Sequence, residues 1–191
     1  MATIAIFHSA LGVREGVRDA AWRLRDAGHD PHIIDYYGDH RSFDDHPSAA
    51  DYVNKIGFPA LMQAAVDGVA DLPDGFAVLG FSNGSGMAEY IATRRSVTKA
   101  VLGSGTLPLA MMGADAWPAQ TAVQIHYSAD DPFRDDEWLQ SVIDSVHSSG
   151  APLEVYTEYP GDGHLFTDST LPDYDEANTE LFWKRVRAFL T

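Results

Sequence analysis

A serine between two glycines is the residue of this sequence best suited to act as a nucleophile. Ser82 lies in Gly80-Phe-Ser-Asn-Gly84, after the apolar run 76–79, typical of a buried strand, and before a segment with apolar residues at helical spacing. Glycines allow a turn too sharp for Cβ atoms at its flanks, with the serine strained and its Oγ clear of the sheet. The helix N-terminus behind it can stabilise negative charge on a substrate. The pattern predicts a nucleophilic serine, and its plain alternative is the Gly-rich turn of an ordinary strand–helix unit.

A serine hydroxyl needs a base, and the base needs an acid to orient it. After a Gly-x-Ser-x-Gly turn, the acid and then the histidine follow along the chain. Of the eight histidines, His147 falls near the end of an amphipathic helix, whereas His164 lies in a Gly-rich loop after the last predicted strand. His164 is therefore the preferred base. The acid is expected after the strand that ends at His126, where Asp130 and Asp131 both qualify and spacing does not separate them.

Alternating strands and helices are expected to position these residues. Short apolar runs predict six strands, at 4–7, 32–35, 76–79, 99–102, 122–126 and 153–156. Helical periodicity predicts helices after Gly12, near 49–69, after Gly84, over 135–148 and over 175–190, with irregular stretches at 36–48 and 103–118. This alternation predicts an α/β fold with a mainly parallel sheet of about six or more strands flanked by helices. The length predicts one domain, 1–191, with little room for a large cap domain.

The composition limits the classes of partner. The chain has 191 residues, 45% of them hydrophobic, and 28 acidic residues against 13 Lys and Arg give a formal net charge of −15. A field of that sign repels nucleic acid and anionic membrane surfaces, so neither is expected as a partner. The chain contains no cysteine, which excludes disulfides and a thiol nucleophile. The N-terminus has no signal-peptide pattern and no segment is long enough to span a membrane, so a cytoplasmic location is expected.

Three motifs together resemble the dienelactone hydrolase family, which has the α/β-hydrolase fold. They are Gly80-Phe-Ser-Asn-Gly84, His126-Tyr-Ser-Ala-Asp-Asp131-Pro-Phe133 and Tyr159-Pro-Gly-Asp-Gly-His164-Leu-Phe166, accompanied by Phe7-His-Ser-Ala-Leu-Gly12 in the first loop and by Tyr174-Asp175, Ala177 and Trp183 near the last helix. The resemblance covers nearly the whole chain in order. It implies a hydrolase of small esters or lactones, with Ser82 as nucleophile, Asp131 as acid and His164 as base, and with the backbone N–H groups of Ala10 and Asn83 as oxyanion donors.

The sequence departs from this family at three positions. The family's namesake has a cysteine nucleophile where Ser82 stands, and a glutamate of its first loop is replaced by Ser9. It also binds a substrate carboxylate through an arginine four residues after the histidine, where this chain has Asp168. Ser9, Leu11 and Asp168 are thus candidates to line the substrate site. An aspartate repels a carboxylate, so small neutral esters or lactones are expected as substrates.

Several other functions are compatible with parts of the sequence. A general carboxylesterase or thioesterase with the same triad is the nearest alternative. A non-catalytic binding protein of the same fold is another, and a flavodoxin-type nucleotide-binding module lacks a convincing phosphate-binding loop here. His29-Asp-Pro-His32, Asp39-His40 and Asp44-Asp45-His46 could contribute to a metal site, but acidic loops often contain such clusters and no H-E-x-x-H spacing occurs. No metal and no cofactor is therefore expected.

Overall fold

Six parallel strands form the central sheet of the computed structural model, which describes all 191 residues. The strands are β1 (Thr3–Phe7), β2 (Asp30–Ile34), β3 (Phe76–Phe81), β4 (Val97–Gly103), β5 (Ala122–Ser128) and β6 (Leu153–Tyr159), and their order across the sheet is β2-β1-β3-β4-β5-β6. Every neighbouring pair is parallel. The six predicted strands are thus confirmed, with shifts of a few residues at their ends.

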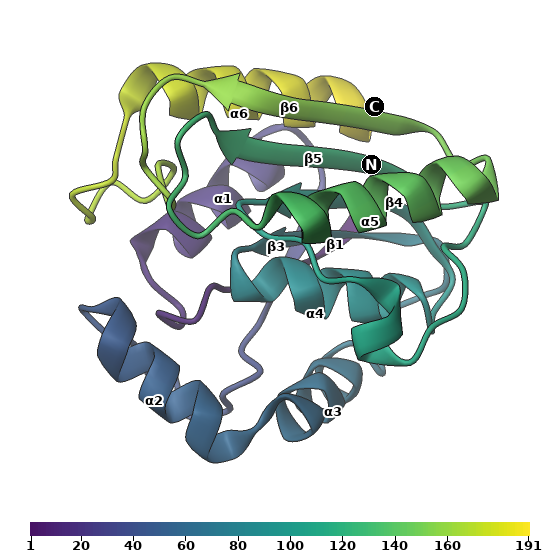
Figure 1. Cartoon of the computed structure of the whole chain (residues 1–191), viewed down its shortest axis with the longest axis horizontal. Coiled ribbons are helices and arrows are strands. Elements are labelled where there is room, and N and C mark those ends of the chain that lie inside the picture. The colour runs from purple at the N-terminus through teal and green to yellow at the C-terminus, as the bar shows by residue number, and fades with distance from the viewer.

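Helices cover both faces of the sheet, which buries the strands on both sides. They are α1 (Glu15–Asp26), α2 (His46–Ile56), α3 (Phe58–Gly68), α4 (Asn83–Ala92), α5 (Asp136–Ser149) and α6 (Glu176–Leu190), with a short 3₁₀ helix, η1, at Leu109–Met112. In Figure 1, α4 and α5 lie in front of the sheet, and α1 and α6 lie behind it. One hydrophobic cluster packs α3, α4 and α5 on the sheet, and a second packs α1 and α6 on the opposite face.

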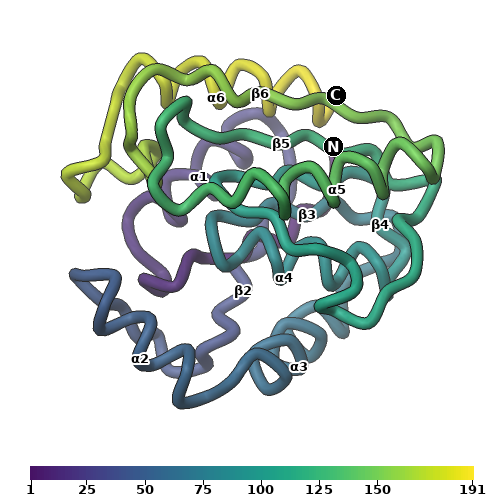
Figure 2. The backbone as a smooth tube through the Cα atoms, viewed as in Figure 1, coloured from purple at the N-terminus to yellow at the C-terminus, as the bar shows by residue number.

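The helix expected near 49–69 is wrong as a single element. The structure has two helices there, α2 and α3, separated at Gly57, and Figure 2 shows the sharp corner that the backbone makes between them. Gly57 has a φ of 85°, which a helix cannot contain, and Pro59 lies at the start of α3, where a proline is tolerated. The apolar periodicity continues through the corner because both helices pack on the same core. This is why the sequence pattern reads as one helix.

The parallel arrangement brings the candidate residues to one edge of the sheet. Ser82 follows β3, Asp131 lies three residues beyond β5, and His164 lies five residues beyond β6. The carboxyl ends of parallel strands meet at one edge, which is where ligands bind in open α/β sheets. No helix of the structure is long and apolar enough to cross a membrane.

Candidate active site

The turn from β3 into α4 holds Ser82 in a strained conformation. Ser82 has a φ of 52°, a region that non-glycine residues rarely adopt, and its N–H donates to the Gly103 carbonyl at 2.7 Å. A Cβ at Gly84 would overlap with the carbonyl oxygens of Phe7 and His8, and a Cβ at Gly80 would overlap with the Gly84 carbonyl. Gly84 is therefore required by the close approach of β1 to α4, and Gly80 by the tight turn between β3 and α4.

Ser82, His164 and Asp131 are joined by hydrogen bonds. The His164 Nε2 lies 2.8 Å from the Ser82 Oγ, and the His164 Nδ1 lies 2.9 Å from each carboxylate oxygen of Asp131. Asp131 and His164 are buried, so their interaction is shielded from water. Asp131 also accepts from the Phe133 N–H, which helps fix the carboxylate. The arrangement can move a proton from the serine to the imidazole.

The two alternatives to these residues lie elsewhere. Asp130 is exposed, and its N–H donates to the Gly161 carbonyl, while its carboxylate has no bond to a histidine. His147 is exposed in the last turn of α5. Neither side chain reaches Ser82.

The loop after β1 contains Ala10 and begins at His8, whose carbonyl lies against Gly84 at the start of α4. The Ala10 N–H makes no backbone hydrogen bond in the structure. The Asn83 N–H belongs to the first turn of α4, where the N–H groups lack partners within the helix. Two tyrosines hold this loop: the Tyr36 hydroxyl donates to the His8 carbonyl and the Tyr37 hydroxyl donates to the Ala10 carbonyl, both at 2.7 Å. Sequence analysis did not assign a role to these tyrosines, which follow the second strand at the start of the predicted surface loop.

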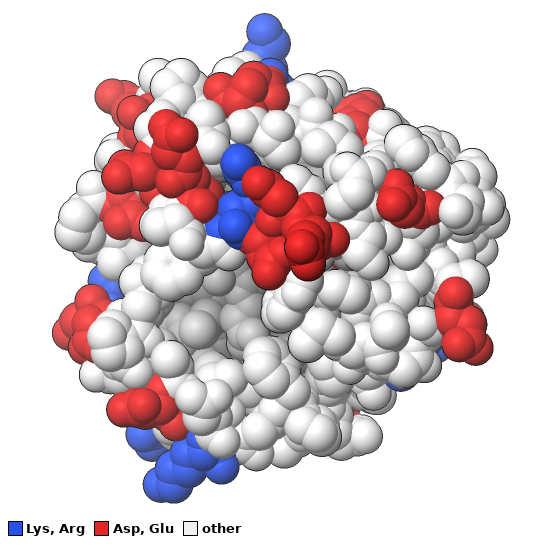
Figure 3. Space-filling model, viewed as in Figure 1, with Lys and Arg blue, Asp and Glu red and all other residues white.

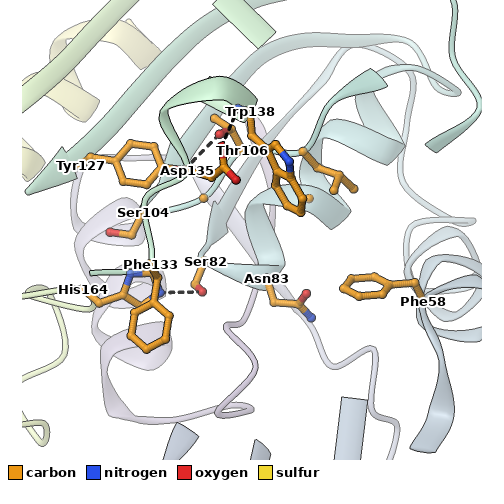
Figure 4. A pocket seen from close by; sticks show the side chains of 13 residues that line it. Phe58, Ser82, Asn83, Ser104, Thr106, Tyr127, Phe133, Asp135, Trp138 and His164 are labelled. Carbon is orange, nitrogen blue, oxygen red and sulfur yellow. Dashed lines mark hydrogen bonds between the residues drawn. The ribbon is translucent and has the colours of Figure 1, made fainter. Parts of the chain in front are cut away.

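A pocket of about 300 Å³ opens beside Ser82. Figure 4 shows Ser82 and His164 on one side of it, Phe58 on the opposite side, and Asp135 and Trp138 at the top of the view. The lining residues are Phe58, Ser82, Asn83, Gly86, Ser104, Gly105, Thr106, Leu107, Tyr127, Phe133, Asp135, Trp138 and His164. The irregular segment after β4 and the first residue of α3 thus supply part of the wall, which the sequence alone did not indicate.

A buried carboxyl group fixes one wall of this pocket. Glu89 of α4 is fully buried, and its Oε2 accepts from the Leu107 N–H at 2.7 Å, while its Oε1 has no partner. Burial without a cation raises the pKa of the Glu89 carboxyl well above its usual range, which favours the neutral acid. On the same wall, the Thr106 and Tyr127 hydroxyls lie 3.1 Å apart. Together these contacts tie the segment after β4 to α4 and β5.

Three sequence candidates do not line the pocket beside Ser82. Ser9 is buried, and its Oγ accepts from the N–H of Leu11, which is itself buried in the core. Asp168 is buried beside Arg14, with its carboxylate 3.6 Å from the Arg14 Nε, and accepts two hydrogen bonds from Thr170. Ser9 and Asp168 border a separate crevice of about 10 Å³, too small for a substrate group. Asp168 and Arg14 both line this crevice, and the charge of Asp168 therefore acts on Arg14.

The histidines considered as metal ligands, which lie from just before β2 to the start of α2, do not gather into a metal site. His32 lies 2.9 Å from Asp30, and His40 lies 3.2 Å from Asp35. His46, the first residue of α2, instead covers the candidate site: its ring centroid lies 5.9 Å from that of His164 and 5.0 Å from that of Phe133. No three His, Asp or Glu side chains of the structure are grouped to hold a metal ion.

The whole chain matches a known family. The sequence model of the dienelactone hydrolase family matches residues 1–191. No curated protein matches the chain. A solved structure of a dienelactone hydrolase-like promiscuous phosphotriesterase from metagenomic libraries is similar at a TM-score of 0.78 and 24% identity, over 98% of this chain and 84% of that one.

Two further structures share the fold at lower identity. An α/β hydrolase from a Medee basin deep-sea metagenome library has a TM-score of 0.73 and 16% identity, over 98% of this chain and 83% of that one. An acetyl ester-xyloside bifunctional hydrolase from Caldicellulosiruptor lactoaceticus has a TM-score of 0.67 and 15% identity, with the same coverage of 98% and 83%. The fold is therefore that of the α/β hydrolases, as predicted.

Proposed function

Because the chain belongs to the dienelactone hydrolase family, we propose that it is a serine hydrolase that cleaves small esters or lactones through an acyl-enzyme. The observation that carries this proposal is the hydrogen-bonded series from the Ser82 Oγ through His164 to Asp131, with heavy-atom distances of 2.8 and 2.9 Å. A general base must lie within such reach of the proton that it removes. The series ends at a pocket that can hold a substrate.

In acylation, the Ser82 Oγ attacks the ester carbonyl carbon while its proton passes to the His164 Nε2. Asp131 accepts from the Nδ1–H, which keeps the Nε2 free as the base and stabilises the imidazolium that forms. The N–H groups of Ala10 and Asn83 are the donors for the oxyanion, and the N-terminus of α4 adds a favourable dipole. His164 then gives its proton to the departing alkoxide, which leaves as the alcohol.

In deacylation, water takes the place of the alcohol. His164 removes a proton from the water, whose oxygen attacks the acyl carbon, and the proton then returns to the Ser82 Oγ as the carboxylic acid leaves. Because a lactone ring opens by the same steps, one site serves esters and lactones. One solved neighbour is described as a hydrolase of acetyl esters, which agrees with this reaction class. A carboxylesterase or thioesterase of broader range would use the same residues.

Labelling with a fluorophosphonate probe tests the proposal directly, because the probe reacts only with an activated serine. We expect peptide mapping to find the label on Ser82. Ser82→Ala should remove labelling and leave turnover of 4-nitrophenyl acetate on the order of 10³–10⁴ over water, from the oxyanion donors and binding alone.

Ser104→Ala is the matched control, because Ser104 lines the same pocket and also has a positive φ, of 54°. It should keep the label and most of the turnover. An unlabelled wild-type protein without ester turnover would favour the alternative of a non-catalytic binding protein. Label on Ser104 would place the nucleophile after β4 instead of β3.

A further inference from the structure

The pocket beside Ser82 has an uneven distribution of charge. Asp135 is the one carboxylate among its lining residues, and no Lys or Arg lines it. Its apolar wall contains four aromatic rings, those of Phe58, Tyr127, Phe133 and Trp138. Phe58, Phe133 and Trp138 are exposed although they are large and apolar. Such exposed rings beside a nucleophile are suited to contact a substrate.

The Asp135 carboxylate keeps an oxygen free for a ligand. Asp135 is the N-cap of α5, where its Oδ1 accepts from the N–H groups of Glu137 and Trp138, both at 3.0 Å. Its Oδ2 takes part in no hydrogen bond or ion pair of the structure. Asp135 lines the pocket, and in Figure 4 it is drawn between Tyr127 and Trp138.

No nearby cation neutralises this carboxylate. Arg134, next to it in the chain, is held by Asp136 and by the carbonyls of Ser128 and Ala129. Arg41 is bound to Asp39 and lies over the Tyr52 ring. Lys55 is exposed on α2. Figure 3 shows a hollow in this face of the molecule with walls of uncharged residues, and along its upper edge a group of acidic side chains with a basic side chain among them.

We propose that this pocket selects esters whose bound group is aromatic or apolar and carries a positive charge, and that Asp135 discriminates against carboxylates. This inference rests on the proposed hydrolase function. A carboxylate and aromatic faces both attract an ammonium group, the rings through their negative quadrupole. The same carboxylate repels an anion, and no arginine is present to bind it. The sequence-based expectation that anions are disfavoured remains a prediction. We now base it on Asp135, because Asp168 faces another crevice.

Three phenyl acetates with para substituents of similar size test the charge selectivity. They are 4-(trimethylammonio)phenyl acetate, 4-tert-butylphenyl acetate and 4-acetoxybenzoate, which are cationic, neutral and anionic at neutral pH. Each kcat/KM is divided by the rate constant for alkaline hydrolysis of the same ester, which corrects for the different leaving groups. At low salt, we expect the corrected kcat/KM of the cationic ester to exceed that of the anionic ester by about five- to tenfold. Added salt should reduce this ratio, because Asp135 is solvated and its charge is screened.

Asp135→Asn removes the charge and retains the cap, since asparagine caps helices as well as aspartate does. It should reduce the cation-to-anion ratio to about twofold, because asparagine carries no charge. Asp144→Asn is the matched control, since Asp144 is an exposed aspartate two turns further along α5 and should preserve the full ratio.

The outcomes separate this inference from the function on which it rests. If none of the three esters is hydrolysed, the hydrolase proposal itself is overturned. Turnover of the neutral ester together with equal rates for cation and anion would overturn only the charge selectivity. A full ratio in Asp135→Asn would also overturn it, because the discrimination would then come from another group.

Discussion

Asp130 and Asp131 are neighbours in the chain but differ in what their carboxylates contact. The Asp131 carboxylate is buried against the His164 Nδ1, and Asp130 is exposed to solvent. The difference in side-chain direction between two adjacent residues cannot be predicted from spacing, which left both residues open as the acid. The difference becomes visible only when the loop after β5 is folded against the loop after β6.

Asp131→Asn should therefore lower kcat on the order of 10³–10⁴-fold, because an amide can donate to the Nδ1 and fix the wrong tautomer of His164. Asp130→Asn should change kcat by less than about twofold. The measurement is kcat and kcat/KM for 4-nitrophenyl acetate, compared between each variant and the wild type at neutral pH. Similar losses in the two variants would contradict the assignment of Asp131.

Residues that follow strand ends can be placed near one another from the sequence, because the topology of a parallel sheet determines where those ends lie. The carboxyl ends of β3, β5 and β6 lie at one edge of the sheet, so Ser82, Asp131 and His164 were bound to be close. The pocket wall depends instead on where surface loops and helices cross that edge. Phe58 and Asp135 come from helix starts far apart in the chain, and no local pattern of the sequence marks them as neighbours.

At the scale of the element, helix α4 owes its place to a glycine that cannot be replaced. Gly84 lies where a Cβ would overlap with the carbonyl oxygens of Phe7 and His8, so α4 packs directly on the backbone of β1. Gly86, two residues later, has room: a Cβ there would meet only the Leu107 side chain, at 3.4 Å.

Gly84→Ala should lower the midpoint of thermal unfolding strongly, by several degrees or more, because α4 or β1 must shift. Gly86→Ala is the matched control on the same helix. It should keep or raise the midpoint, since alanine favours a helix over glycine by about 1 kcal/mol. Circular dichroism on heating gives both values. Equal destabilisation by the two would mean that helix α4 does not depend on the close approach to β1.

The sequence did not predict the corner between α2 and α3, and its physical cause is local. The positive φ of Gly57 is a backbone state that hydrophobic periodicity does not detect. A Gly-Phe-Pro sequence inside an apolar pattern was the available signal, because proline is tolerated at a helix start and disfavoured within a helix. The corner has a consequence for the site, since it turns Phe58 toward the pocket.

For the molecule as a whole, buried titratable groups couple the free energy of unfolding to pH. Burial lowers the pKa of His8 to about 4 and that of His126 well below its usual value. The unfolded chain then binds more protons than the native state as pH falls below about 6.5, so these histidines reduce stability on acidification. His126 is neutral within a buried network, hydrogen-bonded to Tyr159 and Gln124.

Glu89 acts in the opposite direction and can be separated from the histidines by substitution. Burial raises the folded-state pKa of Glu89 above its usual value of 4.5, so its contribution to the free energy of unfolding is fully present below that pH and is lost as pH rises toward the folded-state pKa. Glu89→Gln cannot ionise and still offers an oxygen to the Leu107 N–H. As pH rises above 4.5, the free energy of unfolding of the variant should therefore increase relative to that of the wild type, by at most about 1.4 kcal/mol per pH unit.

Urea unfolding of both proteins from pH 4.5 to 8 measures this difference. The unpaired amide hydrogens of the new glutamine change the free energy of unfolding by a constant amount at every pH. The informative quantity is therefore the slope of the variant-minus-wild-type difference against pH, which should be positive. Glu176→Gln, at an exposed glutamate in the first turn of α6, should give a nearly flat difference. A flat difference for Glu89→Gln as well would mean that the buried carboxyl finds a stabilising partner when ionised, and that α4 holds the pocket wall through a charge instead of a neutral acid.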